Sequence, residues 1–279
     1  MEQDTNEQLH AVAAYYDSFA APGKEGSVTE YEEMYSTPLC KAEDQAVVAT
    51  LTKALSKLQQ QFPGQKLLAA DIGCGEGLGL ELLQSALNQT PSLVPVQYIG
   101  EDISSAMVAQ ASAGFKGKPG VLFTVADMHH IPVLDSSIHL VMSIFGPFSY
   151  SLSPEELVKE IHRVLMPGGI AVIMPYTMRL KIGFLTGATT AQDTDFSHTS
   201  KAYSKTGLEK LFDAWFEQVS IEGMNFLGNM IEKMADLGLL GSGPEIYSQI
   251  LALDNHLNTF LPPECARHMF VIVTKSQNE

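Results

Sequence analysis

The chain of 279 residues carries 32 acidic and 17 basic residues, a formal net charge of −15, and 45% of its residues are hydrophobic. This length and composition predict one globular domain, or one domain with a sizeable insertion. The lysines and arginines form no dense cluster of the kind that a phosphate-tracking surface needs, which argues against a nucleic-acid partner.

The cysteines and the N-terminus narrow the class of protein further. Cys40, Cys74 and Cys265 lie far apart and form no C-x-x-C pair, so we expect neither a metal site nor a redox couple. The first ten residues are polar and acidic, and no apolar run reaches about 18 residues. The sequence therefore predicts a cytoplasmic protein without a membrane span.

The first 62 residues are predicted to form a helical cap and a lead-in helix. Residues 8–20 are typical of a short helix and carry Tyr15 and Tyr16, and apolar residues recur at helical spacing from 42 to 61. This region precedes the first strand and is too short for a second domain. We therefore interpret it as a cover over the site.

The stretch from Leu67 to Gly77 predicts a buried strand, a tight turn and the start of a helix. It reads Leu-Leu-Ala-Ala-Asp-Ile-Gly-Cys-Gly-Glu-Gly. Glycine at alternate positions lets the backbone approach a ligand closely, and the helix start presents unpaired N–H groups. A dinucleotide fingerprint would place its third glycine at Leu78, so a nicotinamide oxidoreductase is disfavoured.

Strands alternate with helices from here to residue 174. Further strands are predicted at 96–100, 121–125, 138–144 and 170–174. Ser104 or Ser105 can cap the helix after the second of these strands, and Ser153 with Pro154 and Glu156 forms a capping-box pattern. This alternation predicts a parallel sheet that is covered on both faces.

The chain after residue 175 is less regular. A long connection leads to a predicted helix at about 206–215 and to strands at 216–221 and 269–274. Two amphipathic segments lie between these strands, and we interpret them as a lid over the carboxyl edge of the sheet. Packing on the sheet and contact with a second copy in a homodimer are the alternatives. The predicted apolar lining of the lid is Met224, Phe226, Met230 and Met234.

Two motifs carry a resemblance to a known family. The form Asp-x-Gly-x-Gly-x-Gly at 71–77 resembles motif I of the class I S-adenosylmethionine (SAM)-dependent methyltransferases. The sequence Arg-Val-Leu-Met-Pro-Gly-Gly at 163–169 resembles the turn before strand five in ubiquinone/menaquinone-type and related small-molecule methyltransferases. The implied fold is an α/β Rossmann-like one, with a seven-stranded, mostly parallel sheet in the order 3-2-1-4-5-7-6, helices on both faces and a small helical cap.

The resemblance also implies a division of the chain and a set of cofactor contacts. The division is a cap at 1–62, a SAM-binding core at 63–223, a helical insertion at 224–265 and a last strand with its tail at 266–279. Asp102 would accept both ribose hydroxyls, with Glu101 as the competing ligand. Asp127 would accept from the adenine amino group. The predicted cofactor-binding residues are Tyr16, Asp71, Gly73, Cys74, Gly75, Gly77, Asp102, Ile103, Asp127, Met128 and Ser143.

The predicted function is transfer of the SAM methyl group to a small-molecule acceptor by in-line displacement, which leaves S-adenosylhomocysteine. Tyr16 would also lie against the cationic end of SAM. No general base is assigned, and His198, Tyr203 and Tyr16 are the candidates. A methyltransferase acting on tRNA or protein and a non-catalytic SAM-binding protein would share the same donor-site residues, so both stay open as alternatives.

Overall fold

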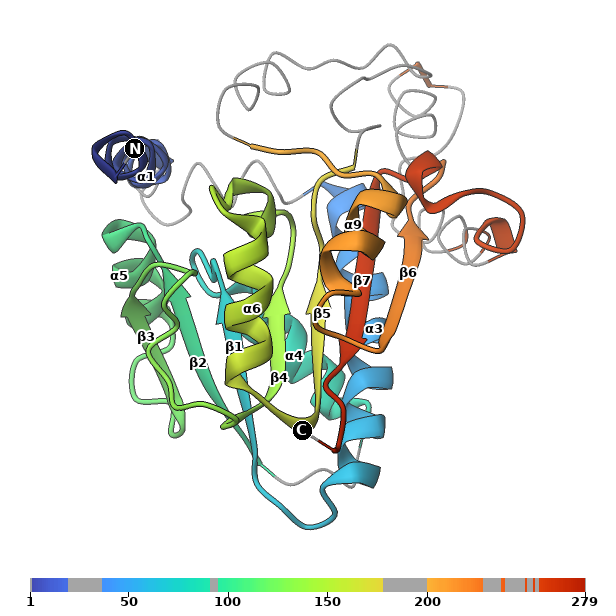
Figure 1. Cartoon of the computed structure of the whole chain (residues 1–279), viewed down its shortest axis with the longest axis horizontal. Coiled ribbons are helices and arrows are strands. Elements are labelled where there is room, and N and C mark those ends of the chain that lie inside the picture. The colour runs from blue at the N-terminus through green and yellow to red at the C-terminus, as the bar shows by residue number, and fades with distance from the viewer. Residues whose placement is uncertain are drawn as a thin grey trace.

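The computed structural model describes residues 2–19, 37–90, 95–177, 200–227, 237–238, 249, 253 and 256–278. These residues form one sheet with helices on both faces (Figure 1). The helices are α1 (Glu2–Phe19), α3 (Pro38–Gln61), α4 (Leu78–Asn88), α5 (Ser105–Gly114), α6 (Pro154–Val164) and α9 (Lys205–Phe212), with short 3-10 turns η1 (Pro147–Tyr150) and η3 (Pro263–Cys265). The strands are β1 (Leu67–Ile72), β2 (Val96–Asp102), β3 (Val121–Val125), β4 (Ile138–Ser143), β5 (Leu165–Ile173), β6 (Gln218–Met224) and β7 (His268–Thr274).

The seven strands lie in the order β3-β2-β1-β4-β5-β7-β6, which confirms the predicted order. Strands β1 to β5 are parallel, whereas β7 runs antiparallel to both β5 and β6. In the β1–β2 register, Asp71 lies beside Gly100 and Ile72 beside Glu101. The carboxyl ends of β1, β2, β3 and β4 therefore meet at one edge of the sheet, where ligands bind in open α/β sheets.

Two hydrophobic clusters hold the helices against the sheet. One cluster joins α3 and α4 to one face, and the other joins α6 and α9 to the opposite face (Figure 1). The predicted apolar stripe of α3 is buried throughout: Val47, Val48, Leu51, Leu55 and Leu58 are at most 7% exposed. Each fully buried aliphatic side chain contributes about 1.5–3 kcal/mol, so this helix is a firm part of the core.

Strand β5 begins earlier than the predicted 170–174. It starts at Leu165, directly after α6, because Ile138 pairs with Leu165 while Leu140 pairs with Ile170. The residues between these partners bulge out of the ladder, and Gly168 has a positive φ of 84° there. The Pro-Gly-Gly turn therefore lies inside this strand and not before it.

The two predicted helix caps have different outcomes. The side chain of Ser104 accepts a 3.1 Å hydrogen bond from the N–H of Met107, as an N-cap should. Ser153 is the N-cap residue of α6, but its side chain makes no capping hydrogen bond. The prediction of a full capping box at Ser153 is therefore wrong, since its backbone (φ −128°, ψ 78°) departs from the extended conformation that aims a side chain at the helix N–H groups.

The predicted lid falls mostly outside the described residues, as do Met230, Met234 and His198. Its first residues are described, and they differ from the prediction. Strand β6 continues through Met224, which is 4% exposed, and Phe226 is 2% exposed. Both side chains are buried, and neither lines the pocket described below.

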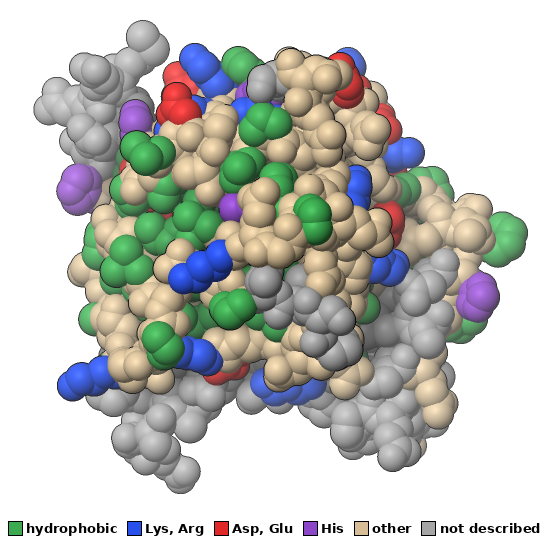
Figure 2. Space-filling view, turned by 90° about the horizontal axis from the view of Figure 1, so that it is seen from below, with side chains coloured by type: hydrophobic (Ala, Val, Ile, Leu, Met, Phe, Trp, Pro, Cys, Tyr) green, Lys and Arg blue, Asp and Glu red, His purple; other side chains and the backbone are tan. Residues whose placement is uncertain are grey.

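The surface also bears on partners. In Figure 2, which views the molecule from below, the Lys and Arg side chains are scattered singly or in small groups among neutral and hydrophobic ones. Within the described part of the chain, no helix combines the length and apolar character that crossing a membrane requires.

Candidate active site

The glycine loop between β1 and α4 is pinned to the end of β2. The N–H groups of Gly73 and Cys74 donate to the carbonyl oxygen of Glu101 at 2.8 and 2.9 Å. A Cβ on Gly73 would lie 2.3 Å from the ring of Pro147, and φ at Gly73 is +69°. By contrast, nothing lies within 4 Å of a Cβ position on Gly75. The loop is thus packed on one side and open on the other.

Asp71 lies beneath this loop and is nearly fully buried. Its Oδ2 accepts a 2.6 Å hydrogen bond from the hydroxyl of Tyr98. A Cβ on Gly79 would lie 2.0 Å from the same oxygen, so the first turn of α4 needs glycine there. Burial raises the pKa of Asp71 to about 7, with the Tyr98 hydrogen bond opposing the shift and Asp102 adding to it.

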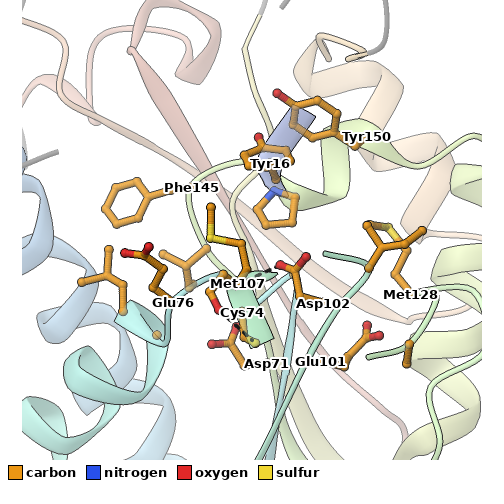
Figure 3. Close-up of a pocket in the computed structure, with 18 of the residues that line it drawn as sticks. Tyr16, Asp71, Cys74, Glu76, Glu101, Asp102, Met107, Met128, Phe145 and Tyr150 are labelled. Carbon is orange, nitrogen blue, oxygen red and sulfur yellow. Dashed lines mark hydrogen bonds between the residues drawn. The ribbon is translucent and has the colours of Figure 1, made fainter. Parts of the chain in front are cut away.

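Asp102 joins the loop to the end of β2. Its Oδ2 accepts from the N–H of Gly75 and its Oδ1 from the N–H of Ser104, each at 2.9 Å. Burial raises the pKa of Asp102, although these backbone hydrogen bonds favour the charged form. Each oxygen has a second lone pair, and the side chain lines the pocket (Figure 3). The carboxylate can therefore accept from a diol while it holds the loop.

Asp127, which follows β3, is oriented by the residue two positions ahead. Its Oδ1 accepts from the N–H of His129 at 3.0 Å and lies 2.7 Å from Nδ1 of the same residue. The other ring nitrogen of His129 lies 2.9 Å from Oγ of Ser151. The His129 hydrogen bond lowers the pKa of Asp127 despite partial burial. Oδ1 is therefore engaged within the chain, and Oδ2 lies 4.0 Å from Nδ1 of His130.

Helix α1 covers this edge of the sheet. Oδ1 of Asp17 accepts from the Ser104 hydroxyl at 2.5 Å and from the Ala106 N–H at 3.2 Å, at the start of α5. The ring of Tyr16 meets that of Tyr150 edge to face, with centroids 5.7 Å apart. In Figure 3, both tyrosines lie above Asp102, on the other side of the pocket from the sheet.

One pocket brings together most of the predicted cofactor-binding residues. It is lined by Tyr16, Asp71, Gly73, Cys74, Gly75, Asp102, Ile103, Asp127 and Met128. Gly77 and Ser143 lie outside this lining. Gly77 is the N-cap of α4, with φ +100°, and a Cβ there would lie 2.6 Å from the ring of Phe115. Ser143 is 1% exposed at the end of β4, and its carbonyl accepts from Met174.

The candidate general bases are not grouped in this pocket. Tyr203 is absent from the lining and packs against Phe148, with ring centroids 5.6 Å apart. Burial, with a smaller contribution from Glu155, raises the pKa of Tyr203, which weakens it as a base. Tyr16 lines the pocket, whereas His198 lies outside the described residues.

Several pocket residues were not predicted from the sequence. Lys41 and Asp44 reach the pocket from the first turns of α3, which reads in the sequence as an ordinary amphipathic helix. Burial raises the pKa of Asp44 to about 6, and Lys41 opposes this shift. Phe145, Pro147 and Tyr150 also line the pocket. The sequence does indicate these three residues: an aromatic-Gly-Pro segment directly follows a predicted strand, where the edge of the sheet binds ligands.

The comparisons with known proteins agree with this geometry. Residues 69–169 match the family model described as a methyltransferase domain, and this range includes the glycine loop, Asp102 and Asp127. Over this range the chain is therefore similar to a methyltransferase domain.

Two curated relatives and one solved structure show how far the similarity extends. The chain is 34% identical over 119 residues to a malonyl-[acyl-carrier protein] O-methyltransferase of Marinomonas sp. (strain MWYL1), covering 42% of each chain. It is 31% identical over 134 residues to the ubiquinone/menaquinone biosynthesis C-methyltransferase UbiE of Campylobacter jejuni, covering 48% of this chain and 54% of that one. The chain thus spans about half the length of these relatives.

The solved structure is a phosphoethanolamine N-methyltransferase 2 of Haemonchus contortus, in complex with phosphomonomethylethanolamine and S-adenosylhomocysteine. Its TM-score is 0.50 at 20% identity, and the match covers 81% of this chain and 52% of that one. At this identity the likeness concerns the fold. The chain, with its seven-stranded sheet, therefore shares the fold of that enzyme.

Proposed function

We propose that this chain binds SAM in the pocket at the carboxyl edge of the sheet and transfers its methyl group to a small molecule. The observation that carries the proposal is the bond from the Gly75 N–H to Oδ2 of Asp102. It places an open glycine backbone next to a carboxylate that has lone pairs to spare. SAM needs both, since its ribose presents a diol and the methionine part attached to that ribose must pass close to the backbone.

The residues of the pocket suit the parts of SAM. Asp102 would accept from the ribose hydroxyls, and Oδ2 of Asp127 would accept from the adenine amino group, with Met128 against the ring. Glu76 gives the loop a negative charge, which suits the ammonium and sulfonium groups of SAM and would repel a pyrophosphate. Tyr16, which meets Tyr150 edge to face, would present its ring to the cationic end.

SAM would supply an activated methyl group: an electron pair of the acceptor would form the new bond to carbon while the carbon–sulfur bond breaks and its electron pair stays on sulfur, and the proton that the acceptor loses would pass to a base or to solvent. This chain's residues have three tasks in that step: binding, alignment and exclusion of water. Helix α1 would exclude water from the side of the pocket opposite the sheet. Asp17 holds this helix in place, since its carboxylate accepts from Ser104 and Ala106 at the start of α5. Of the two base candidates that the structure describes, Tyr16 lines the pocket and Tyr203 does not.

The acceptor is proposed to be small and fairly apolar. The apolar lining of the pocket includes Leu9, Val12, Ile144 and Phe145. The names of the two curated relatives describe methylation at oxygen and at carbon, and both are consistent with such a site. The lid between β6 and β7, the four-part division of the chain, a cytoplasmic location and a homodimer stay predictions that accompany this proposal.

The test is a transfer assay with methyl-labelled SAM. Purified protein is incubated with a panel of small phenols, quinols, carboxylic acids and amines, and S-adenosylhomocysteine formation is measured with and without each acceptor. Acceptor-dependent product that disappears in Asp102→Ala supports the proposal. SAM binding without product from any acceptor, including tRNA and protein extracts, would instead favour a non-catalytic SAM-binding protein.

A further inference from the structure

Glu101 is a buried carboxyl without a partner in the part of the chain that the structure describes. The residue is 2% exposed, and neither Oε1 nor Oε2 has a hydrogen-bond partner there. The next residue, Asp102, has a backbone N–H on each oxygen. Leaving a buried polar group without a hydrogen-bond partner destabilises a fold, so its presence calls for an explanation.

The position of Glu101 is fixed by its own backbone. Its carbonyl accepts from the N–H groups of Gly73 and Cys74, so the residue lies where β2 meets the glycine loop. Its side chain lines the same pocket as Asp102. In Figure 3, the Glu101 carboxyl points toward the side of the pocket where Met128 lies, whereas Asp102 points up toward Tyr16 and Tyr150. The two neighbouring acids thus face different parts of one pocket.

Acids surround Glu101 on each packed element. They are Asp71 on β1, Asp102 on β2, Asp127 after β3 and Glu160 on α6. Arg163 is bonded to Glu160 at 2.7 Å, and His129 is bonded to Asp127. Burial first, and then these four acids, raise the pKa of Glu101 well above its usual range. Burial and the neighbouring acids thus favour the neutral form of Glu101 over the ionised one.

A neutral carboxyl has one O–H donor and retains acceptor lone pairs, whereas the ionised form only accepts. Adenine pairs an amino donor with a ring-nitrogen acceptor on the same edge, and a ribose hydroxyl can both donate and accept. We propose that protonated Glu101 forms a hydrogen bond with the adenosyl group of the bound donor and is a specificity residue of this site. The inference rests on the proposed function, because it assumes an adenosyl ligand.

The test measures binding of S-adenosylhomocysteine by calorimetry from pH 5.5 to pH 9. Glu101→Gln keeps a neutral donor and acceptor, so it should bind within about threefold of the wild type. Glu101→Leu removes both and should bind at least about tenfold more weakly. The affinity of the wild type should fall as the pH rises and Glu101 loses its proton, while that of Glu101→Gln stays level. Glu156→Gln, an exposed change on α6, is the matched control.

Thermal unfolding without ligand checks that each variant is folded. If both Glu101 variants bind S-adenosylhomocysteine as tightly as the wild type does, this inference is overturned and the proposed function stands. If Glu101→Gln binds as weakly as Glu101→Leu, the ionised form is the one required, which also overturns it. If the folded wild type binds no adenosyl ligand, the proposed function itself fails.

Discussion

The hydroxyl of Tyr98 donates a 2.6 Å hydrogen bond to Oδ2 of Asp71 directly beneath the glycine loop. The two side chains come from adjacent strands, and both residues are at most 2% exposed. The same Asp71 oxygen occupies the space that a Cβ on Gly79 would need. This buried pair thus supports the glycine loop from below and fixes the first turn of α4. Its contribution to stability can be measured without any ligand.

Tyr98→Phe should lower the free energy of unfolding by about 1–3 kcal/mol, because it leaves the Asp71 acceptor buried without its donor. Urea unfolding at pH 7 measures the change. Tyr203→Phe is the matched control, since the Tyr203 hydroxyl is buried without a partner among the described residues. That variant should be nearly neutral. Equal losses in both variants would mean that the Tyr98–Asp71 bond has no special weight.

Gly79→Ala should destabilise the fold by about 1–3 kcal/mol, because the new Cβ would lie 2.0 Å from Oδ2 of Asp71 and one of them must move. Gly114→Ala is its control: it also lies in a helix, and nothing is within 4 Å of its Cβ position. There alanine should be neutral or should stabilise by up to about 1 kcal/mol. Thermal unfolding distinguishes the two, and similar melting temperatures would contradict the crowding at Gly79.

Glu43 should make the fold sensitive to acid. Burial alone would raise its pKa, but the charges of His268 and Arg267 and a hydrogen bond from the Asn225 side chain hold it at about 2. Since this folded-state pKa lies below the unfolded value of 4.5, the stabilisation is present above about pH 4.5 and is lost as the pH falls toward 2. Removing one partner of a buried charge pair typically costs about 3–5 kcal/mol.

The measurement compares urea unfolding of the wild type and Glu43→Gln at several pH values. The difference in unfolding free energy should be largest near pH 6 and should shrink steadily as the pH falls from 4.5 toward 2.5. A difference that does not change over this range would show that the charge of Glu43 does not stabilise the fold. Glu209→Gln, which removes a half-exposed carboxylate 3.6 Å from Lys205, is the control and should change stability little.

Asp102→Ala should weaken binding of SAM and S-adenosylhomocysteine by about 1.5–3 kcal/mol, the scale of hydrogen bonds to a charged group. The variant should also lose some stability, because the N–H of Gly75 loses its acceptor. Calorimetry at a temperature well below the melting point separates the two effects. Unchanged affinity in the folded variant would remove Asp102 from the site and point to Glu101 as the ribose ligand.

The sequence was sufficient where local chemistry decides the structure. The alternation of strands and helices predicted a parallel sheet, and the family resemblance supplied the strand order that the structure has. Glycines at alternate positions predicted the loop, and Gly73 and Gly75 do take positive φ angles. The apolar period of α3 predicted its buried face. Each of these features depends on residues close together in the chain.

Long-range contacts were beyond the sequence. Asp17 reaches Ser104, and His129 reaches Ser151, across 87 and 22 positions. Nothing in the local pattern indicates which acid meets which partner. Likewise, Glu101 lacks a hydrogen-bond partner because no described side chain or backbone N–H from the elements around it reaches its carboxyl oxygens. Strand ends were uncertain for a related reason: pairing with β4 and β7 lengthens β5 and β6 beyond their own apolar runs.

The most direct test of the proposed function is calorimetric titration of the purified, folded protein with SAM, S-adenosylhomocysteine, NAD(H) and NADP(H). The account predicts micromolar binding of the two adenosyl ligands at one site per chain and no binding of the nicotinamide dinucleotides. Binding of a dinucleotide without binding of either adenosyl ligand would contradict it, and the roles proposed for Asp102, Asp127 and Glu101 would have to be withdrawn.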